Sequence, residues 1–127
     1  MRFKLYFTLE NPEIQIQYRK SIISYLKFAL SNYDEKYYKK FYNEKDPIIK
    51  DYTFSTYFKN PKIKEDKIYI EDKKFELNIS IVDYETAIIF YNAFNKLKHK
   101  KFSLNKNSLT LENIAIIAEK EITTENI

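Results

Sequence analysis

A chain of 127 residues with 44% hydrophobic residues has the length of one domain and can bury a core without metal ions or crosslinks. It contains no cysteine and one histidine, His99, which excludes disulfides, thiolate metal sites and sites built on several histidines, so we expect no metal and no cofactor. The net charge of +4 favours a polyanionic partner only weakly, because the absence of glycine and the abundance of lysine, isoleucine, asparagine and tyrosine are also typical of A+T-rich codons.

The first nine residues alternate between polar and apolar side chains. The apolar set is Phe3, Leu5, Phe7 and Leu9. A period of two predicts a strand with one buried face. Because the alternation also differs from the unbroken apolar stretch of a signal peptide or membrane span, we expect a cytoplasmic protein without membrane contacts.

Two helices are predicted after the break at Pro12. Apolar side chains recur at helical spacing over residues 17–31, which indicates an amphipathic helix. Asn32 or Asp34 can cap a second, shorter helix that runs to Tyr42. The second helix is expected to extend the first as a kinked hairpin.

Strands are predicted in the middle of the chain. Residues 52–58 are rich in β-branched and aromatic side chains, and aromatic residues occupy alternate positions. Residues 67–70 and 75–81 flank a charged turn, and the second of these segments alternates cleanly. We therefore expect a strand over 52–58 and a hairpin between 67–70 and 75–81.

The last third of the chain predicts one helix and a closing hairpin. Asp83 can cap a helix that is apolar on two sides, which suggests that it contacts something besides its own sheet. Residues 102–104 and 109–111 flank a turn at 105–107. The alternation slips by one position at Glu112-Asn113, which predicts a bulge in the last strand.

The predicted order is strand, helix, two strands, helix and strand. This is the ferredoxin-like βαββαβ arrangement of an α+β domain, an RNA-recognition-like fold with an antiparallel sheet and the helices on one face. Such a sheet leaves its other face free, and related folds bind RNA there. Fold alone does not assign a function.

Four segments, in order, resemble one known family. They are residues 1–11, residues 17–30, the motif Lys50-Asp51-Tyr52-Thr53-Phe54-Ser55, and residues 88–94. Together with the hairpin between them, these segments resemble the Cas-six family of CRISPR repeat-processing endoribonucleases over essentially the whole chain. The resemblance implies binding of CRISPR repeat RNA and metal-independent cleavage, in which the RNA 2′-hydroxyl attacks the neighbouring phosphate.

Two features depart from the family pattern. Family members carry two such domains, and a glycine-rich loop in the second helps to hold RNA, whereas this chain has no glycine. We therefore expect residues 1–127 to form a single ferredoxin-like domain similar to the N-terminal half, as a fragment or a shortened relative. The family's histidine follows the first helix, and residues 42–45 contain none.

Of the family's catalytic helpers, only Lys50 falls at a matching position, where the resemblance implies that it stabilises phosphate charge. Tyrosine and lysine titrate near pH 10, so they are poor general bases at neutral pH. Replacing a histidine by such groups costs on the order of 10²–10⁴ in rate. We expect impaired catalysis, and His99 is a weak candidate because nothing in the family pattern places the scissile phosphate there.

Two basic segments are candidates for contacts with RNA phosphates. One spans residues 18–62 and has tyrosines between its lysines, and the other spans residues 96–106. Pairing with a helix dipole and packing on the core are the alternative roles of these side chains. The candidate RNA-binding residues are Arg19, Lys20, Lys27, Lys39, Lys40, Lys50, Lys98, His99, Lys100 and Lys101.

Three hypotheses remain open. The chain is the RNA-binding domain of a repeat-processing nuclease, or it is a truncated homologue, of host or viral origin, that acts as an anti-CRISPR by replacing or blocking the nuclease subunit of a CRISPR effector complex. In the third, a homodimer forms through the surface that a second domain normally covers, because a large exposed apolar patch promotes association.

Overall fold

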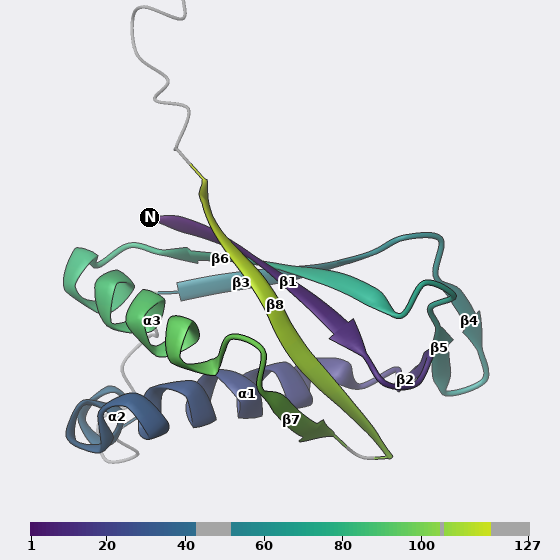
Figure 1. Cartoon of the computed structure of the whole chain (residues 1–127), viewed down its shortest axis with the longest axis horizontal. Coiled ribbons are helices and arrows are strands. Elements are labelled where there is room, and N and C mark those ends of the chain that lie inside the picture. The colour runs from purple at the N-terminus through teal and green to yellow at the C-terminus, as the bar shows by residue number, and fades with distance from the viewer. Residues whose placement is uncertain (43–51, 105, 118–127) are drawn as a thin grey trace, which may run out of the picture.

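The computed structural model describes residues 1–42, 52–104 and 106–117. Its main sheet has five antiparallel strands in the order β3-β6-β1-β8-β7, and a small sheet has the order β2-β5-β4 (Figure 1). This is the predicted ferredoxin-like α+β fold, in which the helices pack on one face of the main sheet. The elements are β1 (Arg2–Leu9), β2 (Glu13–Gln15), α1 (Tyr18–Tyr33), α2 (Glu35–Phe41), β3 (Tyr52–Phe58), β4 (Lys62–Lys64), β5 (Lys67–Tyr69), β6 (Lys74–Ile81), α3 (Tyr84–Leu97), β7 (Lys101–Leu104) and β8 (Asn107–Ile117).

The central strand β1 confirms the predicted alternation. It lies between β6 and β8, and its apolar residues, such as Phe3 and Phe7, are buried against the helices. Tyr6 pairs with Asn113 and Phe7 pairs with Leu111, so Glu112 is the extra residue of a β-bulge. The bulge therefore occurs at the position where the sequence pattern slips.

The two predicted N-terminal helices form. The buried stripe of α1 is Ile22, Tyr25, Leu26, Ala29 and Leu30. Asp34 caps α2, since its carboxylate accepts a hydrogen bond from the backbone N–H of Tyr37 at 3.1 Å. No helix in the part of the chain that the structure describes is long and apolar enough to cross a membrane.

Helix α3 begins at the predicted cap. The Asp83 carboxylate accepts hydrogen bonds from the Thr86 backbone N–H at 2.9 Å and from the Thr86 hydroxyl at 2.7 Å. One side of the helix, including Phe90, is buried against α1 and the sheet. Tyr84 and Ile88, on another side, are exposed. The helix is therefore apolar on a buried side and on an exposed side.

The predicted hairpin between residues 67–70 and 75–81 is wrong. β6 pairs with β3 over seven residues and with β1 on its other side. β5 pairs instead with β2 and β4, and Ile68 lies opposite Ile14 in the small sheet. Ile70 follows β5 and donates its backbone N–H to the carbonyl of Pro12 at 2.7 Å. The short β2 supplies the partner groups that β5 needs, so β6 is free to pair with the longer β3.

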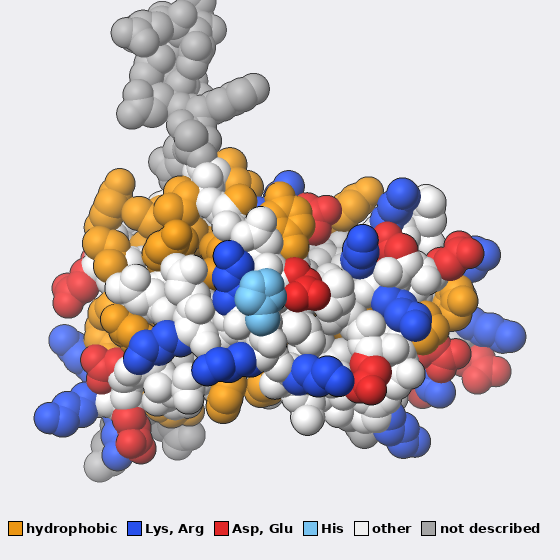
Figure 2. Space-filling view, viewed as in Figure 1, with side chains coloured by type: hydrophobic (Ala, Val, Ile, Leu, Met, Phe, Trp, Pro, Cys, Tyr) orange, Lys and Arg blue, Asp and Glu red, His pale blue; other side chains and the backbone are white. Residues whose placement is uncertain are grey.

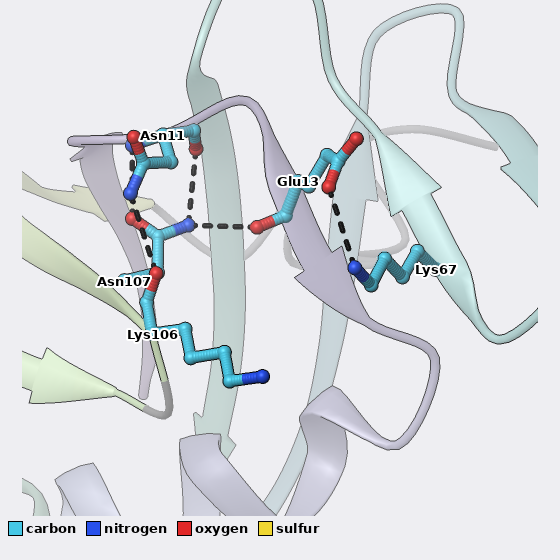
Figure 3. A network of polar contacts seen from close by, with 5 residues as sticks. All are labelled: Asn11, Glu13, Lys67, Lys106 and Asn107. Carbon is cyan, nitrogen blue, oxygen red and sulfur yellow. Dashed lines mark hydrogen bonds and ion pairs between the residues drawn. The ribbon is translucent and has the colours of Figure 1, made fainter.

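Asn107, the first residue of β8, connects the main sheet to the segment that leads into the small sheet (Figure 3). Its side-chain amide donates to the carbonyls of Asn11 at 3.0 Å and Glu13 at 2.9 Å, and its side-chain oxygen accepts from the Asn11 backbone N–H at 2.9 Å. The Asn11 amide donates in turn to the carbonyl of Lys106. Lys67 pairs with Glu13 at 3.7 Å, which adds a contact within the small sheet.

Because the chain has no glycine, its left-handed turns use other residues. Such a conformation costs roughly 1–2 kcal/mol for a residue with a Cβ atom. Most of these residues lie in the connections between strands, and His99 lies between α3 and β7. The described residues with positive φ are Asn60, Glu65, Lys73, His99 and Lys106.

Candidate nucleic-acid interface

The side of the main sheet that faces away from the helices is polar, and we call it the open face. Tyr57, Glu76, Tyr6 and Asn113 are paired in one row across β3, β6, β1 and β8. Tyr6 is 37% exposed and Tyr57 is 55% exposed. The two tyrosines are separated by one intervening strand, which sets them about 10 Å apart.

A groove of about 530 Å³ runs along this row. Backbone and side-chain groups of β1, β3 and β6 form its floor, and Lys59 and Lys74 lie along it. A second recess of about 360 Å³ on the same face is lined by Arg2 and by small polar side chains such as Ser55 and Asn78. The open face therefore offers aromatic surfaces, cations and hydrogen-bonding groups together.

The charges on the open face are mixed. Lys4 forms an ion pair with Glu76 at 3.3 Å, at the middle of the face. Asp72 and Glu112 also line the groove. These carboxylates offset much of the positive charge, so a ligand of this face would be held by stacking and hydrogen bonds as much as by charge.

The basic segment after α3 lies at the β7 edge of the sheet and adjoins the open face. His99 Nδ1 is 3.4 Å from a carboxylate oxygen of Glu112, and the other oxygen of Glu112 accepts a hydrogen bond from Thr8 at 3.1 Å. Figure 2 shows the histidine on the near surface with a carboxylate beside it. Lys98 is half-buried, whereas the next two lysines in the chain, Lys100 and Lys101, are exposed.

The basic residues of α1 lie on the covered side of the sheet. The Arg19 guanidinium stacks 4.4 Å from the centre of the Phe54 ring, and the Lys27 ammonium lies 5.4 Å from the centre of the Tyr42 ring. We call this group the α1–β3 flank. β3 and β7 are the two edge strands of the main sheet. The two predicted basic segments nevertheless meet on the helix side, since the Lys96 ammonium lies 5.1 Å from the centre of the Tyr33 ring and the ring centres of Phe28 and Phe102 are 5.3 Å apart.

Three other predicted RNA-binding residues are exposed on the helices. Lys39 pairs with Glu35 at 3.7 Å within α2, and Lys20 and Lys40 are exposed. Lys50, the predicted catalytic residue, lies outside the described residues.

The hydroxyl of Tyr42, beside Lys27, is held in its protonated form. Burial raises the pKa of Tyr42, and the hydrogen bond that joins its hydroxyl to that of Tyr52 at 3.2 Å adds to the effect. Among the described residues, no group of three or more His, Asp or Glu side chains is arranged to hold a metal ion.

The open-face residues are absent from the sequence-based list of sites. These residues are the polar members of the strand alternation, for example Arg2, Lys4 and Tyr6 in β1. In the sequence, the alternation predicts the buried side of the strand, and the polar side was not considered as a site. The exposed Tyr57 was part of an aromatic alternation in β3. Because strand order was needed to place these residues in one row, local charge counts missed them.

No protein-family model and no curated protein sequence matches the chain. Solved structures do match it. A structure described as a RAMP protein binding different RNA substrates matches with a TM-score of 0.77 at 21% sequence identity. The matched region covers 97% of this chain and 50% of that protein's chain. The product of a Cas6-related gene from Pyrococcus furiosus has a TM-score of 0.78 at 19% identity with the same coverage.

A third structure, described as CRISPR associated protein Cas6, matches with a TM-score of 0.69 at 20% sequence identity. The matched region covers 95% of this chain and 50% of that protein's chain. The chain spans about half the length of these three proteins. At these identities the likeness concerns the fold. The chain therefore has the fold of the Cas6 and RAMP proteins, over about half of their length.

Proposed function

We propose that this chain is a CRISPR repeat RNA-binding domain of the repeat-processing endoribonuclease type. One observation carries the proposal: Tyr6 and Tyr57 stand exposed in one row on the open face of the sheet, among lysines, in a fold shared with Cas6 and RAMP proteins. Base–aromatic stacking contributes about 1–3 kcal/mol per base to binding of single strands.

The open face suits single-stranded RNA for a second reason. Bases laid on the tyrosine rings would direct their edges and the 2′-hydroxyl groups toward Glu76 and Asn113 in the same row, which can accept or donate hydrogen bonds. Lys59 and Lys74 lie beside the groove, where they can contact phosphates. The same strand would continue past Glu112 to the lysines at the β7 edge.

A second tract for phosphates is proposed on the helix side. Its residues project from α1 and α2, and Arg19 and Lys27 are held in place by the aromatic rings beneath them. The proposed contacts on this side are Arg19, Lys20, Lys27, Lys39 and Lys40.

Cleavage is proposed to be impaired. The chain's single histidine lies at the β7 edge beside Glu112, whereas the resemblance places the reacting phosphate after α1. Tyr42, at the end of α2, has a pKa raised by burial and is a poor base. Lys50 remains the proposed stabiliser of phosphate charge.

An alternative function is favoured by one observation, the exposed apolar side chains Tyr84 and Ile88 on α3. Such a surface suits a protein partner. In this alternative the chain acts as an anti-CRISPR that occupies the nuclease's place in an effector complex. It would then bind effector subunits more tightly than it binds repeat RNA.

The test is binding of fluorescent CRISPR repeat RNA, measured by anisotropy without metal ions. Tyr6→Ala and Tyr57→Ala are each expected to weaken binding roughly 5- to 150-fold, which corresponds to the loss of one stacked base. The phenylalanine variants keep the ring and are expected to bind as the unmodified protein does. Tyr69→Ala is the matched control, because Tyr69 is 38% exposed on β5 in the small sheet.

Three outcomes decide between the readings. Equal losses in Tyr6→Ala and Tyr69→Ala would show that the open face is not the binding surface. Absence of RNA binding together with capture by effector subunits would favour the alternative. Cleavage at one phosphate at a rate typical of histidine-dependent enzymes would refute impairment and direct attention to Lys50.

A further inference from the structure

Glu76 occupies the middle of the open face, between its two exposed tyrosines. In the row of paired residues that crosses the strands, Tyr57 on β3 and Tyr6 on β1 are the neighbours of Glu76 on β6. Adjacent strands lie about 5 Å apart, so the carboxylate is within reach of the edge of a base stacked on either ring. All three residues line the groove of about 530 Å³.

The position of Lys4 distinguishes the two tyrosines. The Lys4 ammonium lies 3.3 Å from Oε1 of Glu76, and the two side chains are 31% and 30% exposed. Lys4 precedes Tyr6 by two residues on β1 and therefore projects from the same face of the sheet. Tyr57 and Lys4 are separated by the strand that carries Glu76. A base on the Tyr6 ring would thus meet both the carboxylate and the ammonium.

A carboxylate at this place needs a hydrogen-bond donor from the ligand. An ionised carboxylate accepts hydrogen bonds and donates none, and it repels phosphate groups. The donors of single-stranded RNA are the N–H groups of the bases and the 2′-hydroxyl groups of the riboses. Glu76 is therefore suited to the edge of a base or to a ribose hydroxyl, and not to the backbone phosphates.

We infer that Tyr6, Glu76 and Lys4 form a subsite that selects guanine; this inference rests on the proposed function and specifies the base that the open face reads. Among the RNA bases, guanine alone presents an acceptor followed by two adjacent donors along its Watson–Crick edge, O6, N1–H and N2–H. The protein offers the complementary order, Nζ of Lys4 followed by Oε1 and Oε2 of Glu76. Nζ donates to O6, and the two carboxylate oxygens accept from N1 and N2 while the base stacks on Tyr6.

The other bases make fewer of these hydrogen bonds. Adenine and cytosine each present one amino group next to ring acceptors, so one oxygen of Glu76 has no base N–H to accept from. Uracil presents one N–H between two carbonyls and sets a carbonyl oxygen against the carboxylate. Guanine is expected to bind roughly 5- to 150-fold more tightly than these bases, the discrimination typical of a bidentate contact to a base edge.

The test uses short RNAs that differ at one base. Fluorescein-labelled oligouridines with guanosine, inosine, adenosine or uridine at the central position are titrated with the chain, and binding is measured by anisotropy. Inosine is guanosine without the 2-amino group, so the comparison isolates the bond from N2. We expect guanosine to bind at least about fivefold more tightly than inosine, because a hydrogen bond to a charged group is lost.

Three variants separate base selection from affinity. Glu76→Gln replaces one carboxylate oxygen by a donor, so the preference for guanosine over inosine is expected to disappear while binding of oligouridine persists. Tyr6→Ala is expected to lose the preference together with affinity, whereas Tyr57→Ala is expected to lose affinity and keep the preference. Glu13→Gln is the matched control, because Glu13 is also ion-paired, with Lys67 at 3.7 Å, but lies on β2 in the small sheet.

The outcomes separate this inference from the function on which it rests. Equal affinities for the guanosine and inosine RNAs, with binding still weakened by Tyr6→Ala, would overturn the guanine subsite and leave RNA binding by the open face in place. A preference that survives Glu76→Gln, or that is lost equally in Glu13→Gln, would also overturn the subsite. Absence of binding by every RNA would overturn both proposals. Circular dichroism shows whether each variant is folded, and the guanosine–inosine comparison needs no variant.

Discussion

The two faces of the main sheet are built from neighbouring residues of the same strands, yet they have opposite environments. Phe7 is buried under α1, while Tyr6, the preceding residue, is exposed on the open face. Phe75 and Glu76 on β6 show the same contrast. A period of two therefore determines both which side chains pack in the core and which side chains are presented on the open face.

The largest expected effect on stability comes from replacing Phe7 by alanine, and the same replacement of its neighbour Tyr6 is the comparison. The Phe7 ring stacks on Phe75 at 4.8 Å and meets Tyr25 edge-on at 5.3 Å. Phe7→Ala should lower the free energy of unfolding by about 3–5 kcal/mol in urea denaturation. Tyr6→Ala should change it by no more than about 0.5 kcal/mol while weakening RNA binding. A similar loss of stability in both variants would show that the open face is part of the core.

The same contrast explains how much of the fold the sequence predicts. The alternation over β1 and the helical spacing and Asp83 cap of α3 predict these long elements correctly, and the slip at Glu112-Asn113 marks the bulge. The three-residue strands β2 and β4 are too short to show a period, so the partner of β5 was assigned incorrectly. Pairing between distant segments is decided by tertiary contacts that local patterns do not contain.

The candidate site was less predictable for a related reason. Charge along the sequence identified Arg19 and Lys27, but only the folded chain shows that they stack on Phe54 and Tyr42. Conversely, Tyr57 and Tyr6 become one surface only when β6 lies between their strands. Local charge therefore locates cations, whereas strand order determines which groups act together.

The second largest effect is expected at the β7–β8 turn, where side-chain hydrogen bonds of Asn107 connect the main sheet to the segment that leads into the small sheet. Asn107→Ala removes three side-chain hydrogen bonds to Asn11 and Glu13, and should lower the free energy of unfolding by about 2 kcal/mol. Asn78→Ala on the open face is the control and should have an effect within about 0.5 kcal/mol. Equal urea midpoints for the two variants would mean that the connection to the small sheet adds nothing to global stability.

The buried hydroxyl of Tyr25 on α1 is expected to lower the stability of the fold, so its removal should raise the free energy of unfolding. Tyr25 is buried, and its hydroxyl has no hydrogen-bond partner among the described residues, while burial raises its pKa. Tyr25→Phe should raise the free energy of unfolding by about 1 kcal/mol, because an unpaired buried hydroxyl is removed. Tyr18→Phe is the matched control and should be destabilising, since the Tyr18 hydroxyl accepts a bond from Thr56 at 2.9 Å. Destabilisation by both substitutions would indicate that Tyr25 has a polar partner after all.

The smallest effect is expected at the exposed start of α3. Hydrogen bonds from the Thr86 hydroxyl and backbone N–H lower the pKa of Asp83 below its ordinary value of 3.8. A carboxyl with a lowered pKa in the folded state contributes stability that is fully present above pH 3.8 and is lost as pH falls from there through the folded-state value. Asp83→Ser keeps an oxygen that caps the helix but does not titrate in this range. Thermal melts of the two proteins between pH 6 and pH 3 should therefore converge as pH falls, and a constant difference would show that Asp83 acts through geometry and not through its charge.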